Sequence, residues 1–113
     1  MGQGSEAQCR LAVYGSLAPG RPNHHQLAAL RGEWRAGRVR GRLVEQGWGA
    51  AMGYPGLVPD KEGDEIAVQL FESPDLPEHW TRLDAFEGDG YRRAVVSAQT
   101  DIGPVDAFIY VIA

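Results

Sequence analysis

Cysteine is nearly missing from this chain, because Cys9 is the single one among 113 residues. No disulfide can therefore form within the chain, and such sparing use of cysteine is typical of a reducing compartment. Long apolar runs are missing as well: none approaches the roughly 20 residues that cross a bilayer. The first residues also lack the basic and apolar regions of a signal peptide. We therefore expect a cytoplasmic protein without a membrane partner.

Positive charge is in short supply, since 11 basic residues face 15 acidic ones and the formal net charge is −4. This balance argues against a nucleic-acid-binding surface. The three histidines, His24, His25 and His79, do not repeat the spacing of a metal-ligand set. The local signatures of cysteine nucleophiles are missing around Cys9. The sequence therefore predicts neither a metal site, nor a thiol enzyme, nor a nucleic-acid partner.

The chain does have enough apolar residues, 43% of the sequence, to bury one core. We expect a disordered N-terminal tail over residues 1–8 and a single domain over residues 9–113. Apolar segments predict short strands over residues 11–14, 38–45, 67–71, 91–99 and 105–112. Helical spacing predicts helices near residues 24–31 and 76–87.

The glycine- and proline-rich segment 50–58 is expected to be irregular. Short loops and few helices favour an α+β fold with a mixed, mainly antiparallel sheet. Closure of that sheet into a small β-barrel would remove the exposed edges of so many short strands.

One carboxylate stands where a core residue is expected. Leu76, Trp80 and Leu83 form an apolar stripe at helical spacing, and the next position on that stripe is Glu87. A carboxylate that faces inward loses hydration, which raises its pKa and suits it to act as a general base. The alternative is that the helix has frayed by this point and that Glu87 caps the turn or pairs with Arg92 or Arg93.

The turn after the first strand, Tyr14-Gly15-Ser16-Leu17, is the second candidate site. Glycine lets the backbone approach a ligand closely, and successive amide N–H groups can cradle an anion or a developing oxyanion. The segment lacks the frame of a nucleophile elbow and of a phosphate loop. Taken alone, the segment favours a merely structural turn, because a strand followed by a Gly-Ser turn is common.

Four blocks together are more specific than any one of them. They are Tyr14-Gly15-Ser16-Leu17, Gly20-x-Pro22-Asn23-His24, Gly53-Tyr54-Pro55-Gly56-Leu57 and Leu83-Asp84-x-Phe86-Glu87-Gly88-x-x-Tyr91-x-Arg93. In this order the blocks resemble the gamma-glutamylcyclotransferase-like family over nearly the whole chain. The resemblance implies a compact mixed barrel with two helices and one cavity. The short chain is similar to the smaller bacterial members and to gamma-glutamylamine cyclotransferases.

The resemblance also implies site residues: Glu87 as the catalytic residue, and Tyr14, Gly15, Ser16 and Leu17 as substrate-binding residues. The implied reaction is of the acyltransferase or lyase type and needs no cofactor or metal. The α-amino nitrogen of a gamma-glutamyl amide attacks the substrate's own side-chain carbonyl, so the reaction is intramolecular. Glu87 would remove the proton from the ammonium group, and the products would be 5-oxoproline and a free amine.

The expected partner is thus a small-molecule gamma-glutamyl amide. Two alternatives stay open. The protein is either a barrel that binds a small metabolite without turnover, with Glu87 holding the ligand's ammonium group, or a scaffold for other proteins. Tyr91 and Tyr110 either line the cavity or belong to the core or the surface.

Overall fold

The computed structural model describes residues 7–14, 25–44 and 56–112. Its elements in chain order are β1 (Arg10–Val13), α2 (His25–Ala28), β2 (Glu33–Val44), β3 (Gly56–Pro59), β4 (Asp64–Glu72), η2 (Leu76–Glu78), α3 (Trp80–Glu87), β5 (Tyr91–Thr100) and β6 (Gly103–Ile112). Within these described ranges, no helix is long and apolar enough to cross a membrane.

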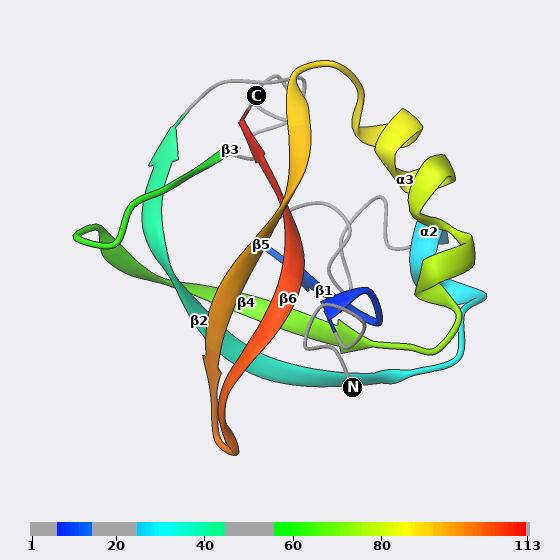
Figure 1. Ribbon diagram of the computed structural model, residues 1–113, viewed down its shortest axis with the longest axis horizontal. Helices are drawn as coiled ribbons and strands as arrows, with labels where there is room; N and C mark the ends of the chain where they lie inside the picture. The colour runs from blue at the N-terminus through cyan, green and yellow to red at the C-terminus, as the bar shows by residue number, and fades with distance from the viewer. Residues whose placement is uncertain (1–6, 15–24, 45–55, 113) are drawn as a thin grey trace.

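The strands form one sheet that closes on itself (Figure 1). Their order is β3-β2-β4-β1-β6-β5. β2 also pairs with β5, where Arg38 lies opposite Gln99. Five strands (β2, β4, β1, β6 and β5) thus make a closed barrel, to which β3 adds through β2. The expected mixed barrel is confirmed: β1 runs parallel to β6, with Leu11 opposite Phe108. The expectation of a mainly antiparallel sheet is corrected to that extent.

The expectation of two helices is wrong in its details. The first shrinks to the single turn α2, because the chain tightens where the Leu30 N–H donates to the Leu27 carbonyl at 3.0 Å. The second divides into η2, a 3₁₀ turn in which the His79 N–H donates to the Leu76 carbonyl at 2.8 Å, and the α-helix α3. Among the described residues, α3 is therefore the one α-helix longer than a single turn.

The segment expected to be irregular contains a strand. β3 pairs with the end of β2, with Gly41 opposite Pro59 and Val44 opposite Gly56. Proline and glycine are disfavoured in strands, so pairing with β2, rather than local propensity, holds these residues in the sheet.

The last two residues of the expected N-terminal tail, Ala7 and Gln8, contact the rest of the fold. Ala7 is buried, and the Gln8 carbonyl accepts a hydrogen bond from the Trp80 indole at 3.0 Å. These two residues therefore pack on the fold, while residues 1–6 lie outside the described ranges.

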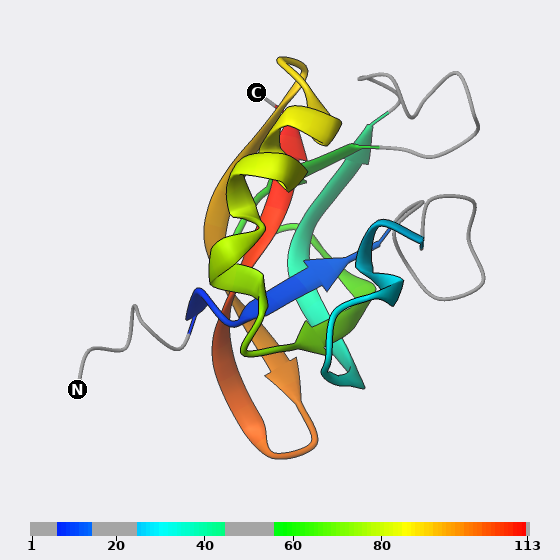
Figure 2. The ribbon, with the colours of Figure 1, turned by 90° about the vertical axis from the view of Figure 1, so that its right-hand side faces the viewer.

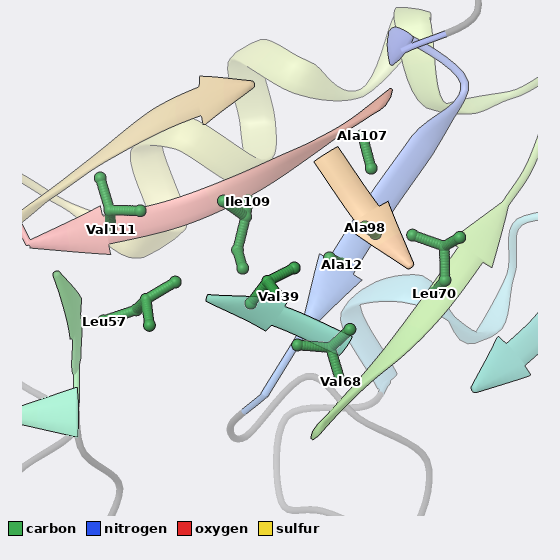
Figure 3. Close-up of a cluster of buried hydrophobic side chains, with 9 residues drawn as sticks. All are labelled: Ala12, Val39, Leu57, Val68, Leu70, Ala98, Ala107, Ile109 and Val111. Atoms are coloured by element: carbon green, nitrogen blue, oxygen red, sulfur yellow. The ribbon is translucent and has the colours of Figure 1, made fainter. Parts of the chain in front are cut away.

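Two apolar layers hold the molecule together. All six strands contribute to the barrel interior, which Figure 3 shows as a set of converging side chains: Ala12, Val39, Leu57, Val68, Leu70, Ala98, Ala107, Ile109 and Val111. A second cluster lies outside the barrel, where β1, β4 and β6 meet the helical segments: Leu11, Val13, Leu27, Phe71, Leu76, Trp80, Leu83 and Tyr110. Because side chains alternate along a strand, the same strands serve both layers. α2 and α3 lie on one side of the barrel (Figure 2).

Candidate active site at the end of helix α3

Glu87 is the last residue of α3 and is buried, with 8% of its surface exposed. Leu76, Trp80 and Leu83 are buried with it, as the spacing of the stripe predicts. Gly88 follows with φ of 81°, a left-handed conformation that suits glycine and ends the helix. The alternative of a frayed helix is therefore wrong: α3 continues to Glu87 and turns its side chain inward.

Burial has an electrostatic consequence for Glu87. Desolvation disfavours the charged carboxylate and raises its pKa from 4.5 to about 7. The group is therefore divided between its protonated and ionised forms near neutral pH. A carboxylate in this state can both accept and return a proton.

Tyr14 follows β1 directly, and its hydroxyl ties three strands together. It donates to the Tyr110 carbonyl at 2.7 Å and accepts from the Leu57 N–H at 2.9 Å. Burial raises the pKa of the Tyr14 phenol, and the negative charge of Glu87 raises it further. Tyr14 is thus a neutral phenol, and it lies close enough to Glu87 for the charge of Glu87 to raise its pKa.

The other residues of the predicted substrate loop, Gly15, Ser16 and Leu17, lie outside the described residues. Of that loop, the structure describes only Tyr14, at its start. The backbone amides of residues 15–17 therefore remain a prediction.

Tyr110 connects α3 to the barrel wall. Its hydroxyl donates to Asp84 Oδ1 at 2.6 Å, while its carbonyl receives the Tyr14 hydroxyl. Burial raises the pKa of the Tyr110 phenol; the hydrogen bond and charge of Asp84 and the charge of Glu87 raise it further. Its hydrogen bonds therefore connect α3, β6 and the end of β1, which are far apart in the sequence.

Arg93 of β5 completes this group. Its Nε lies 3.1 Å from Asp84 Oδ1, and its Nη2 donates to Oδ2 at 3.2 Å. The guanidinium lies over the Trp80 ring at 4.6 Å and over the Phe108 ring at 4.7 Å. Both aromatic contacts favour a cation. Arg93, one of the two predicted partners of Glu87 in the alternative interpretation, is therefore paired with Asp84.

The residues missed as site residues are Asp84 and Arg93. Both belong to the sequence block that surrounds Glu87, and Asp84 precedes it by three positions. That spacing places the two carboxylates within one turn of α3. The block itself was the available signal, but nothing in the sequence indicates that Tyr110 is their partner.

An open cavity of about 580 Å³ lies beside the end of α3, with Tyr91, Arg93, Phe108 and Tyr110 in its walls. Tyr91 and Tyr110 therefore line a cavity, and Tyr110 also belongs to the buried cluster outside the barrel. Neither Glu87 nor Tyr14 is among the residues that line this cavity. A second hollow, of about 690 Å³, lies between β2 and β5 and contains none of the predicted site residues.

Metal binding finds no support in residues 7–14, 25–44 and 56–112. No three His, Cys, Asp or Glu side chains there are grouped so that they could hold a metal ion. His79 instead contacts the Arg82 guanidinium, whose Nε lies 3.3 Å from its Nδ1. His24 lies outside the described residues.

Comparison with known proteins gives a consistent result. Residues 11–113 match the family model "Gamma-glutamyl cyclotransferase, AIG2-like". No curated protein sequence matches the chain.

Solved structures share the fold. YkqA from Bacillus subtilis is 32% identical with a TM-score of 0.71, and the match covers 92% of this chain but 35% of YkqA. The protein therefore spans about a third of that relative. An AIG2-like protein from Mus musculus is 24% identical with a TM-score of 0.71, over 93% of this chain and 77% of its own. PH0828 from Pyrococcus horikoshii is 27% identical with a TM-score of 0.65, and the match covers 91% of this chain and 76% of PH0828.

Proposed function

The chain belongs to the gamma-glutamyl cyclotransferase, AIG2-like family, and from that premise we propose that it converts a gamma-glutamyl amide to 5-oxoproline and a free amine. The observation that carries the proposal is the buried Glu87 carboxylate, whose pKa is raised to about 7 and whose charge raises the pKa of Tyr14. A base is most effective when its pKa lies near the working pH.

The proposed reaction needs one proton carrier. The α-amino group of the substrate binds as an ammonium ion, and Glu87 removes one proton from it. The freed nitrogen attacks the γ-carbonyl carbon, and a new C–N bond closes the five-membered ring. Glu87 gives its proton to the nitrogen of the departing amine as the C–N bond to that amine breaks. The ring nitrogen still carries two hydrogens, so Glu87 takes the second proton from it and passes this proton to the amine, which leaves as an ammonium ion. Because both partners belong to one molecule, much of the acceleration comes from folding the substrate into the reactive shape.

The proposed oxyanion site is the backbone of the loop that Tyr14 begins. Charge develops on the γ-carbonyl oxygen as the ring closes, and amide N–H groups of Gly15, Ser16 and Leu17 would stabilise it. Support comes from Tyr14 alone: its hydroxyl anchors the start of the loop to β6 and β3 through two hydrogen bonds.

The test is release of 5-oxoproline, measured by mass spectrometry across a panel of gamma-glutamyl amines, amino acids and dipeptides. We expect turnover of at least one class by the wild type. Glu87→Gln keeps the size of the side chain and removes the base, so turnover should fall by ~10²–10⁴-fold while the protein stays folded. Equal rates in the two proteins would remove Glu87 from the mechanism.

A binding protein gives a different outcome in the same experiment. A ligand that binds and stays intact for hours, with no 5-oxoproline released, would replace the enzyme by a non-catalytic metabolite-binding barrel. A protein that binds no member of the panel and tolerates Glu87→Gln without functional loss would instead fit a scaffold.

A further inference from the structure

Asp84 lies one helical turn before Glu87, and it joins α3 to two strands of the barrel. One carboxylate oxygen, Oδ1, receives the Tyr110 hydroxyl of β6 at 2.6 Å and lies 3.1 Å from Arg93 Nε of β5. The other, Oδ2, receives Arg93 Nη2 at 3.2 Å. The backbone of Asp84 takes part as well, because its carbonyl accepts the Gly88 N–H at 3.0 Å. Asp84 thus touches both the barrel and the end of the helix.

The Arg93 side chain is a rigid anchor for this carboxylate. Its guanidinium lies over both the Trp80 ring, at 4.6 Å, and the Phe108 ring, at 4.7 Å, and 26% of the side chain is exposed. Trp80 and Phe108 also meet edge to face, with ring centroids 5.1 Å apart. The guanidinium therefore lies in the corner that the two rings form. These contacts restrict the Arg93 side chain before it meets Asp84.

Tyr110 extends the connection into the barrel. Its hydroxyl binds Asp84, and its carbonyl accepts the Tyr14 hydroxyl, which in turn accepts the Leu57 N–H. Through its hydroxyl and its backbone carbonyl, Tyr110 therefore links Asp84 of α3 to Tyr14 after β1, and Tyr14 links onward to β3. These hydrogen bonds connect the helix that ends in Glu87 to Tyr14.

We propose that Asp84 is a positioning residue, which Arg93 and Tyr110 hold so that the last turn of α3 keeps Glu87 buried. The effect on geometry stands by itself. The effect on catalysis rests on the proposed function, in which Glu87 is the base. Misplacing a catalytic group by a small distance costs rate even when the group itself is intact.

Two phenols have a pKa that the charge of Glu87 raises: Tyr14 after β1 and Tyr110 of β6. Tyr110 in turn responds to the charges of Asp84 from α3 and Arg93 from β5, and Tyr14 to that of Tyr91 from β5. The cause of the raised pKa of Glu87 is desolvation. If the last turn of α3 loosens, water reaches the carboxylate and its pKa falls toward the ordinary value of a glutamate. The titration of Glu87 thus reports how well the turn is held.

The experiment follows Glu87 in the protein without substrate. Carboxyl ¹³C NMR gives the pKa of Glu87, and hydrogen exchange gives the protection of the Gly88 amide, which bonds to the Asp84 carbonyl. The variants are Tyr110→Phe, which removes one hydroxyl and no charge, and Asp84→Asn. The matched control is Asp75→Asn, which breaks another Asp–Arg pair, with Arg31 at 2.9 Å, at the start of the same helical segment.

We expect both test variants to lower the pKa of Glu87 and to speed exchange of the Gly88 amide by about tenfold or more, while the control leaves both unchanged. With substrate, kcat should fall by roughly 10- to 100-fold at an unchanged fold. Tyr110→Phe keeps the ring that packs in the core, so it decides the matter if Asp84→Asn does not fold.

Two results would overturn the proposal. One is a Glu87 pKa and Gly88 protection unchanged in Tyr110→Phe and Asp84→Asn. The other is a pKa that falls in Asp84→Asn alone with protection unchanged, because that is the direct effect of removing a charge. A wild-type protein without turnover would contradict the proposed function, and the two NMR measurements would still decide the positioning role.

Discussion

The two faces of strand β6 meet opposite environments. Inward, Ala107, Ile109 and Val111 are fully buried in the barrel and touch only an apolar cluster. Outward, Phe108 and Tyr110 meet α3 and a group of charged side chains. One strand of alternating side chains therefore builds the stable interior and the wall of the candidate site at once.

The difference shows where this small protein places its polar chemistry. A charge inside the barrel would lose its hydration without a partner, which is costly. In the layer under α3, Arg93 has Asp84, and Glu87 responds to burial by a pKa raised to about 7. The cluster inside the barrel is thus apolar throughout, whereas the layer between the barrel and the helix combines apolar packing with the groups suited to proton transfer.

The largest effect on stability should come from the inner face. Ile109→Ala removes a fully buried side chain from the barrel interior, and the cavity should lower the free energy of unfolding by about 2–5 kcal/mol. Denaturant titration measures this loss, which should be the same at acidic and neutral pH. The pKa of Glu87 should stay where it is. A loss below about 1 kcal/mol would contradict the division between the two faces.

Glu87 should give the next largest effect, with the opposite sign and a dependence on pH. Its pKa is raised in the folded protein, so the stability linked to its protonated form is present below the unfolded value of 4.5 and is lost as pH rises through about 7. Glu87→Gln removes this loss. We compare the free energy of unfolding of the variant with that of the wild type at each pH. Between pH 5 and pH 8 this difference should shift in favour of the variant by about 2–3 kcal/mol.

Unfolding measured on both proteins at several pH values checks this expectation. The matched control is Ile109→Ala, whose difference from the wild type should not depend on pH. If the wild type and Glu87→Gln lose or gain stability in parallel across this range, the carboxylate is not desolvated in the fold.

Tyr14 lies where the two environments meet, and its hydroxyl should have an intermediate effect. Tyr14→Phe leaves the Leu57 N–H without its acceptor and takes a donor from the Tyr110 carbonyl. Because Leu57 is fully buried, the loss of these bonds should cost about 1–3 kcal/mol. Thermal or denaturant unfolding measures it. A neutral effect would mean that water replaces the hydroxyl.

The sequence predicts what repeats along the chain. The stripe of Leu76, Trp80 and Leu83 extends to Glu87 by simple helical spacing, and all four side chains are buried. The family blocks add the closed barrel. β3 was missed because its glycine and proline signal a turn, whereas the strand exists through its pairing with β2. Local propensity loses there to a partner distant in sequence.

The connection through Asp84 shows the same limit at the level of side chains. Tyr110 is 26 positions from Asp84, and no periodicity links the two. Only the closed sheet, which sets Arg93 opposite Tyr110, brings both side chains to the helix. Sequence spacing can therefore nominate Glu87, while its supporting residues emerge from the register of β5 and β6.

The smallest effect should come from an ion pair of the same chemistry placed outside both layers. Arg35 Nη1 lies 2.9 Å from Asp101 Oδ1, where the aspartate side chain is 77% exposed. Water and salt screen such a pair, so Asp101→Asn should change stability by about 0–1 kcal/mol and leave Glu87 untouched. Denaturant titration at low and high salt measures this change. Arg93 is less exposed than Arg35, at 26% against 35%, and its guanidinium also lies over two aromatic rings. If Asp101→Asn proved as costly as Asp84→Asn, the value of an Asp–Arg pair in this protein would not depend on its surroundings, and the contrast between the surface and the layer under α3 would fail.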